Sequence, residues 1–232
     1  LGLREAKIDP WKLDAILVTH EHNDHIQGVG VLSRKFRVPV FANAGTWGAM
    51  ARKIGRISPP HHKIFKDYHK FKVGEMDIMP FSIHHDAVEP VGFAIESGNE
   101  KVSVITDTGF VDDDMMEAIE GSDIYYFEAN HDEMMLMTGS YPNELKARIL
   151  SENGHLSNKQ AGEALKNLLR ERGESVLLAH MSMENNEEVL CLNTVVGILE
   201  DAGVDVYNKQ NIMVAPRYVP SKFICCREEI IV

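Results

Sequence analysis

Four potential metal ligands fall within six residues, directly after an apolar run, and this feature constrains the chain more than any other. The run covers residues 13–19, and His20, His22, Asp24 and His25 follow it. In an extended loop His20 and His22 point the same way, because side chains alternate with period two. Asp24 and His25 should then lie on the first turn of a helix, turned toward a different point. One short segment can therefore serve two adjacent metal ions.

Short β-branched runs alternate with helical stretches along the chain, which predicts an α/β protein with layered sheets. We find no repeat and no linker, so residues 1–232 should form a single domain. The expected strands cover about 13–19, 38–41, 91–96, 101–106, 124–127, 175–179 and 212–215, with a hairpin across 70–83. The expected helices cover about 24–36, 112–121, 143–152, 158–172 and 187–201, and the fourth is entered through a capping box of Ser157 and Gln160.

The charge balance bears on the partners of the protein. The chain has 24 lysines and arginines against 35 aspartates and glutamates, a net charge of -11. A protein that wraps nucleic acid usually shows a basic excess, so this balance argues against a broad electrostatic footprint. Phosphate substrates stay possible, because bound divalent cations would reverse the field locally.

The cysteines and the hydropathy pattern bear on location. Cys191, Cys225 and Cys226 are odd in number and two of them are adjacent, which favours a reducing compartment, the cytoplasm. No run approaches 18 uninterrupted apolar residues, so we expect no membrane span.

Several motifs along the chain resemble those of one known family. The pattern His-x-His-x-Asp-His after a strand resembles the signature of the metallo-β-lactamase superfamily. Residues 83–92, 105–109 and 177–182 resemble its later motifs in the same order. The sequences of residues 85–90, 128–132, 154–158 and 180–186 are similar to those of the YycJ/WalJ group, which is exonuclease-like and related to RNase Z.

The resemblance implies a fold and a ligand set. The fold is an αββα sandwich, and because the Ser- and Gly-rich hairpin and the Asp-Ala-Gly turn of the group are absent, we expect its first N-terminal strands to be missing here. The ligands of one metal would be His20, His22 and His85, those of the other Asp24, His25 and His180, and Asp107 would bridge the pair.

Some of these residues have alternative interpretations. His84 competes with His85, since only one of two neighbours on a strand can face a site, and the family wording favours His85. Asp107 is also a plausible turn former before Thr108 and Gly109. His131 suits pocket lining and structure equally well. We interpret the remaining histidines, His61, His62 and His69, as ordinary surface residues.

The implied function is hydrolysis of phosphodiester bonds with two divalent metal ions, zinc or manganese. DNA or RNA is the expected substrate, which makes the protein a nuclease. Asp24 would orient the attacking water as well as bind metal. His155 would contact the scissile phosphate or protonate the leaving oxygen, its alternative being a helix-entry residue with no catalytic duty.

Three other functions are compatible with the same fold. The first is a phosphodiesterase for a small cyclic or nucleotide substrate, which needs no basic track. The second is a thioester or lactam hydrolase. The third is a non-catalytic binding domain, which loss of ligands would signal, yet every expected ligand position is occupied.

Overall fold

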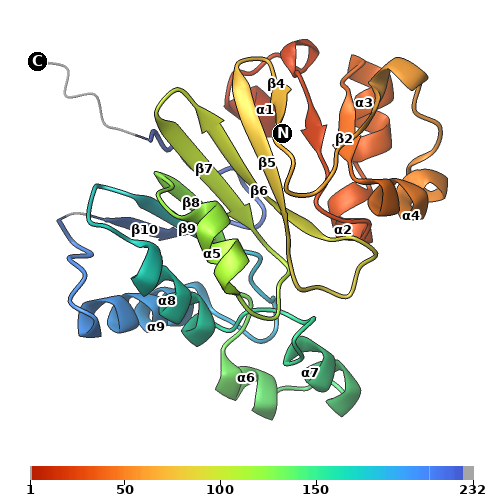
Figure 1. The fold of residues 1–232 in the computed structure, drawn as a ribbon. Coiled ribbons are helices and arrows are strands. Elements are labelled where there is room, and N and C mark those ends of the chain that lie inside the picture. Colours follow the sequence, from red (N-terminus) through yellow and green to blue (C-terminus); the bar gives the residue numbers. More distant parts are fainter. Residues whose placement is uncertain (1, 209, 227–232) are drawn as a thin grey trace, which may run out of the picture. The chain divides into compact units, whose positions relative to one another are not determined.

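The computed structural model describes residues 2–208 and 210–226. They divide into two compact units: unit 1 comprises the described residues of Leu1–Ser82 and Asp86–Ser97, and unit 2 those of Ile83–His85 and Gly98–Val232. Both units combine strands with helices (Figure 1), which confirms the α/β class. The expectation of a single domain stays a prediction.

Unit 1 contains two groups of paired strands. One is a parallel set in the order β1-β2-β3, and the other an antiparallel set in which β5 pairs with both β4 and β6. The strands of unit 1 are β1 (Ile16–Leu17), β2 (Val40–Ala42), β3 (His62–Ile64), β4 (Phe71–Val73), β5 (Met76–Ser82) and β6 (Val91–Ser97).

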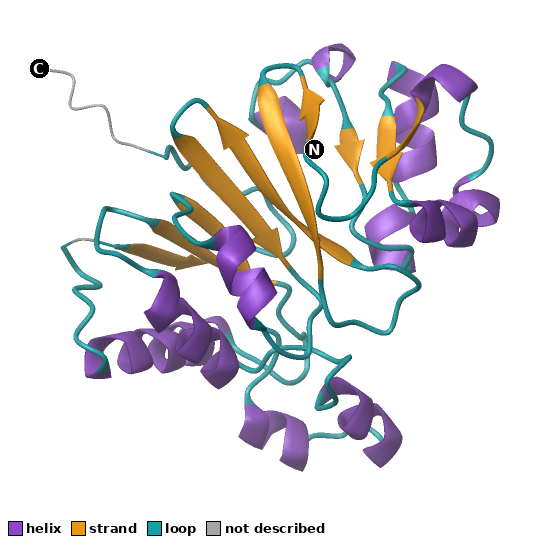
Figure 2. Ribbon diagram, in the orientation of Figure 1, coloured by secondary structure: helices purple, strands orange, loops and turns teal. Residues whose placement is uncertain are grey.

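Alternating side chains give the parallel strands two apolar faces. Val40 and Ala42 belong to a core with Trp47, Met50 and neighbouring residues of the helices, which cover this face (Figure 2). Phe41, between them in sequence, packs instead into a second core with residues of the antiparallel strands. The helical segments of unit 1 are α1 (Gly2–Glu5), η1 (Pro10–Lys12), α2 (Asn23–Ile26), α3 (Val29–Phe36), α4 (Ala44–Ile54) and η2 (Pro59–His61).

The helix expected over residues 24–36 is two helices, α2 and α3, separated at Gln27 and Gly28. Asp24 and His25 lie on α2, as expected from the sequence. Glycine has low helix propensity, and Gly28 serves as the N-cap of α3. Because the two helices are separate, α2 carries the ligand candidates Asp24 and His25 while α3 packs against the core through Val29.

Unit 2 is built on four parallel strands in the order β10-β9-β8-β7. Parallel neighbours need crossover connections, and helices supply them. Helices α8 and α9 contact each other and lie beside the strands (Figure 1). The elements of unit 2 are β7 (Glu100–Ile105), α5 (Asp113–Ile119), β8 (Ile124–Glu128), α6 (Glu133–Thr138), α7 (Asn143–Ile149), α8 (Asn158–Leu168), β9 (Ser175–Ala179), α9 (Glu188–Asp201) and β10 (Asn211–Val214).

The capping box is confirmed: the Ser157 hydroxyl accepts from the backbone N–H of Gln160, and the Gln160 side chain accepts from the backbone N–H of Ser157. Helices α4 and α6 and strand β3 were not expected. Helix α4 contains Gly45 and Gly48, which weaken its helical signal in the sequence, and it is stabilised by burial of Trp47 and Met50.

Replacing either of two glycines of unit 1 by alanine should change the free energy of unfolding, in opposite directions. A Cβ on Gly30 of α3 would lie 2.0 Å from the carbonyl oxygen of Ile54, whereas a Cβ on Gly48 of α4 would meet nothing within 4 Å. We expect Gly30→Ala to destabilise the protein by about 1–3 kcal/mol through overpacking. Gly48→Ala should stabilise it by up to about 1 kcal/mol, because alanine favours the helix. Urea unfolding measures both, and effects of the same sign would contradict the close approach of α3 to Ile54.

Candidate metal centre

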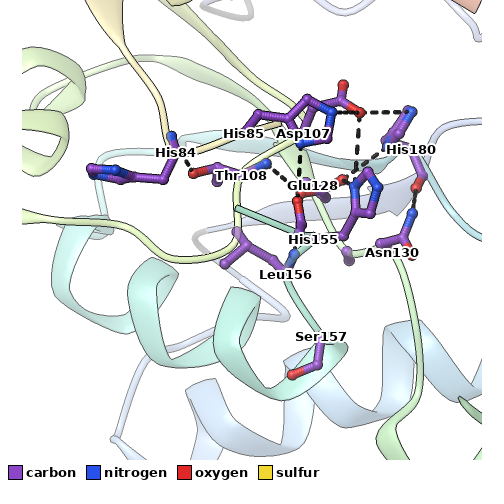
Figure 3. Close-up of polar contacts among 12 residues, drawn as sticks. His84, His85, Asp107, Thr108, Glu128, Asn130, His155, Leu156, Ser157 and His180 are labelled. Carbon is purple, nitrogen blue, oxygen red and sulfur yellow. Dashed lines mark hydrogen bonds and ion pairs between the residues drawn. The ribbon is translucent and has the colours of Figure 1, made fainter. Parts of the chain in front are cut away.

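Three ligand-type side chains lie at the carboxyl ends of three adjacent parallel strands of unit 2 (Figure 3). Asp107 follows β7, Glu128 is the last residue of β8, and His180 follows β9. The strands end level with one another, since Ile105 pairs with Phe127 and Glu128 with Ala179. The carboxyl edge of a parallel sheet is where α/β proteins usually bind ligands.

The backbone turns sharply at two of these positions. Asp107 has φ 62° and His180 has φ 53°, both in the left-handed region that most residues avoid. Aspartate and histidine tolerate this region better than most residue types. Backbone of this kind clusters at functional sites. Here it occurs just after the ends of β7 and β9, at the two ligand candidates themselves.

The carboxylate of Glu128 is the hub of the cluster. One oxygen, Oε2, accepts from the backbone N–H groups of Thr108 at 3.0 Å and Leu156 at 3.1 Å. The other, Oε1, lies 2.9 Å from Nδ1 of His155 and 2.8 Å from Nδ1 of His180. A side chain with no exposed surface therefore contacts four donors.

These contacts keep Glu128 ionised. Burial alone would raise the pKa of this carboxyl, but the hydrogen bonds from His155 and His180 outweigh it and lower the pKa to about 2. An ionised carboxylate only accepts, so each of the two histidines must carry its proton on Nδ1. In the neutral form of each ring this leaves the lone pair on Nε2, the form in which histidine binds a metal.

His85 is oriented in the same way by a backbone carbonyl. Its Nδ1 lies 3.2 Å from the oxygen of Gly154, and its Nε2 lies 3.7 Å from Oδ1 of Asp107. Gly154 must be glycine, because a Cβ there would lie 2.1 Å from the carbonyl oxygen of Ile149. The segment that supplies His155 therefore also positions His85.

His84 is engaged elsewhere. Its Nε2 lies 2.5 Å from Oδ2 of Asp112, and its ring stacks on Phe110 with centroids 3.9 Å apart. Figure 3 shows its ring pointing away from the cluster around Glu128. Of the two neighbouring histidines, His85 is therefore the one that lies beside Asp107.

The residues of unit 2 fit a divalent cation. Ligand atoms of Asp107, Glu128, His155 and His180 lie within 4.8 Å of one another. Nε2 of His180 lies 3.4 Å from Oδ1 of Asp107, against 3.7 Å for Nε2 of His85. In a tetrahedral site with bonds of about 2.0–2.1 Å, neighbouring ligand atoms lie about 3.4 Å apart. Oδ1 of Asp107 thus lies at about the spacing of neighbouring ligands from each of two imidazole nitrogens, which suits a carboxylate shared between two ions.

Unit 1 holds the histidine-rich loop, residues 20–25. His20 is fully buried, and its ring lies 4.7 Å from that of His22 and 4.1 Å from that of His25, between centroids. The hydroxyl of Thr19 contacts Nδ1 of His20 at 3.1 Å and Nδ1 of His25 at 3.3 Å. The loop therefore gathers its three imidazoles at one place, whereas the spacing alone predicted that His25 would turn toward a different point from His20 and His22.

The carboxylates around this loop differ in exposure. Asp24 is exposed, with Oδ2 3.6 Å from Nε2 of His25. Asp86 has Oδ1 3.9 Å from Nε2 of His22. Glu21 is buried and accepts from the backbone N–H of Val88 at 3.0 Å. Glu21 thus holds the loop in place, while Asp24 faces solvent.

His131 is buried, with 1% of its surface exposed, and neither ring nitrogen has a hydrogen-bond partner among the described residues. Burial lowers the pKa of this imidazole to about 4. His131 is therefore neutral at physiological pH, and its backbone oxygen accepts from Asn158 at the start of α8.

Sequence reasoning missed Glu128 as a site residue. The signal was available, because Glu128 ends an apolar strand just as Asp107 follows one. Its role depends on meeting His155 and His180, which lie 27 and 52 residues further along the chain. No pattern in the sequence reports contacts at those separations.

Comparisons with known proteins agree with this geometry. Residues 3–181 match the family described as beta-lactamase superfamily domain. The chain is 40% identical over 203 residues to the exodeoxyribonuclease YycJ of Bacillus anthracis, covering 88% of this chain and 77% of that protein. It is 42% identical over 206 residues to the exodeoxyribonuclease WalJ of Streptococcus pneumoniae, with the same two coverages.

A solved structure shows the same fold. The metallo-β-lactamase fold protein YhfI from Bacillus subtilis superposes with a TM-score of 0.67, at 18% identity, over 91% of this chain and 78% of that one. Together with the family match, this confirms the expected fold class.

The hub at Glu128 predicts an effect on metal affinity. Glu128→Gln keeps the shape of the side chain but removes the charge that holds His155 and His180 with Nδ1 protonated. We expect metal affinity to fall about 10- to 100-fold, as is usual when the residue that orients a metal ligand is replaced. Competition with a chelating dye measures the affinity.

Glu174→Gln is the matched control. Glu174 is also a buried carboxylate with a lowered pKa, and it accepts from the backbone N–H groups of Arg170 and Arg172. This variant should lose stability while keeping its metal affinity. Equal affinities for Glu128→Gln and Glu174→Gln would refute the orienting role of Glu128.

Proposed function

Because the chain belongs to the beta-lactamase superfamily, and within it to the group of YycJ and WalJ, we propose that it is a metal-dependent nuclease that hydrolyses phosphodiester bonds at DNA ends. The observation that carries the proposal is identity of 40–42% to two exodeoxyribonucleases over 88% of the chain. The cluster around Glu128 supports it, since this chain retains residues that fit a divalent cation.

We propose the following ligand assignment for two divalent ions, zinc or manganese. The chemistry of the donors supports it, since imidazole and carboxylate suit both metals. When bound, such ions supply an activated water and neutralise charge on phosphate oxygens. The ligands are His20, His22 and His85 for one ion and Asp24, His25 and His180 for the other, with Asp107 shared.

Two residues have further roles in the proposed reaction. Asp24 is exposed, so its carboxylate is able to accept a hydrogen bond from the attacking water and orient it. His155 contacts Glu128 through Nδ1, so Nε2 is the ring nitrogen that meets the substrate in this proposal. Nε2 then contacts the scissile phosphate or delivers a proton to the leaving oxygen, and the adjacent Glu128 carboxylate stabilises the charged ring.

We also propose that the protein acts in the cytoplasm. Cys191, Cys225 and Cys226 form no disulfide within the described part of the chain, which suits a reducing compartment. Within the same residues, no helix is both long enough and apolar enough to cross a bilayer.

The alternative substrate is a small cyclic or nucleotide phosphodiester, favoured by the net charge of -11. Metal-loaded protein should degrade end-labelled duplex DNA and act at least about 100-fold more slowly, by kcat/KM, on bis(p-nitrophenyl) phosphate and a cyclic dinucleotide. Chelation should abolish the nuclease activity, and zinc or manganese should restore it. A preference for either small substrate, or inert metal-loaded protein, would overturn the proposal.

His155→Ala tests the role of the substrate-side histidine. We expect kcat on duplex DNA to fall about 10²- to 10⁴-fold, the usual contribution of a general acid, while the metal content stays that of the native protein. His84→Ala is the control, since His84 contacts Asp112 and Phe110 instead of the cluster. Loss of bound metal in His155→Ala, or unchanged turnover, would remove His155 from this role.

A further inference from the structure

Charge is distributed very unevenly along this chain. Residues 25–66, here called the basic stretch, contain eight lysines and arginines and no aspartate or glutamate, although the chain as a whole has a net charge of -11. The whole-chain charge therefore conceals a strongly positive segment. The segment belongs to unit 1 and contains α3, β2, α4, η2 and β3.

The basic stretch lines a surface cavity of about 550 Å³ that is open to solvent. It is formed where the carboxyl end of α3 approaches the turn that follows α4 and the start of η2. No carboxylate lines it, and the side chains around it offer hydrogen-bond donors and positive charge. This arginine cavity is lined by Ser33, Arg34, Arg37, Arg56, Ser58, Pro59 and His61.

The backbone places the three arginines at defined points around the cavity. Nη1 of Arg34 donates to the carbonyl oxygen of Ile54 at 2.8 Å and ties α3 to the end of α4. Arg37 caps α3 in the left-handed conformation, with φ 57°. Gly55, with φ 75°, ends α4 and directs the chain into Arg56. Two helix ends thus place their arginines around one space.

These arginines are not neutralised by carboxylates of the protein. Within the described residues, no ion pair joins Arg34, Arg37 or Arg56 to an aspartate or glutamate. Arg37 and Arg56 are exposed, and Nδ1 of His61 lies 3.1 Å from the hydroxyl of Ser58. Clustered guanidinium groups repel one another, so the cavity is more stable with an anion bound.

The chemistry of the lining fits an oxyanion such as phosphate. The planar guanidinium fork pairs with two phosphate oxygens at once, and the serine hydroxyls add further donors. The basic stretch continues outside the cavity with residues such as Lys35 and Lys63, both exposed, which suits a polyanion that extends beyond the cavity. A nucleic-acid backbone has this property, whereas a single small anion does not need it.

The position along α3 relates the cavity to the histidine-rich loop. Helix α3 begins three residues after α2 ends, and its eight residues span about 12 Å. Successive phosphates of one DNA strand advance by about 3.4 Å along the helix axis, so about 12 Å corresponds to three or four nucleotides. A substrate that contacts both the loop and the cavity must therefore span about this length, which a duplex does and a dinucleotide does not.

We propose that the arginine cavity binds the phosphodiester backbone of the DNA substrate several nucleotides away from the bond that is cut. This inference rests on the proposed nuclease function and adds to it a second binding site that favours long substrates over small ones. It also explains how a chain with an acidic net charge retains DNA: the attraction comes from the arginine cavity and the basic stretch around it.

The test compares the double variant Arg37→Gln/Arg56→Gln with the control Arg52→Gln, in the full metal-loaded protein. Arg52 is an exposed arginine of the same basic stretch that does not line the cavity. The probe is a fluorescent duplex of about 16 base pairs with phosphorothioate linkages at its ends, which resist cleavage. Fluorescence anisotropy gives Kd between about 50 and 200 mM salt.

We expect the double variant to bind the duplex about tenfold more weakly than the native protein. Its slope of log K against log salt should be smaller by nearly two, because each DNA phosphate that is no longer neutralised reduces the slope by about 0.9. The control should change Kd by less than about twofold, and a fluorescent dinucleotide should bind the native protein and the double variant equally. Thermal unfolding establishes that the variants are folded, and Arg34, which holds Ile54, is left intact.

Equal affinity and slope for the double variant and the control would overturn the proposal. So would an equal weakening on the dinucleotide, which would make the cavity a site for small anions. Because the probe is not cleaved, this result is independent of catalysis. Absence of nuclease activity alongside the expected weaker binding would refute the nuclease and leave the DNA-binding site, whereas nuclease activity with unchanged binding would refute the cavity alone.

Discussion

The carboxylate of Glu128 is negatively charged and fully buried, a state that costs several kcal/mol unless donors surround the charge. Its two backbone donors, Thr108 and Leu156, belong to the chain after β7 and to the entry of α8, and its two imidazole donors are His155 and His180. The one charge therefore holds two segments of backbone together and sets the tautomer of two histidines. Removing it would leave four donors without their acceptor, two of them buried backbone N–H groups, which is why the rest of the cluster depends on it.

Charge acts at two scales in this protein. Over the whole chain it is negative, which favours solubility and works against broad contact with nucleic acid. Within residues 25–66 it is wholly positive, and folding brings Arg34, Arg37 and Arg56 around one cavity. At physiological salt the Debye length is about 8 Å, so a phosphate in the cavity responds to its lining far more than to acids elsewhere. The net charge by itself is thus a poor guide to what unit 1 can bind.

Much of the secondary structure was predictable because strong local signals coincide with it. Strand β9 occupies the expected residues 175–179, and Ser157 with Gln160 begins α8 as its capping pattern predicts. The misses have local causes as well. Glycines dilute the helical pattern of α4, and β3 is a three-residue exposed strand whose pairing with β2 supplies the order that its sequence does not indicate. Whether such elements form depends on packing against partners that are distant in the sequence.

The sequence alone determined the types of ligand and their local spacing, since His20, His22, Asp24 and His25 occupy one loop and helix start whatever surrounds them. It also placed Asp107 and His180 at strand ends, where loops carry chemistry. Only the tertiary structure decided that His85 lies beside Asp107 while His84 contacts Asp112, that Glu128 orients two histidines, and that three arginines share a cavity. The physical reason is that these outcomes depend on contacts between residues far apart in the chain, and local periodicity carries no information about which distant partner a side chain will meet.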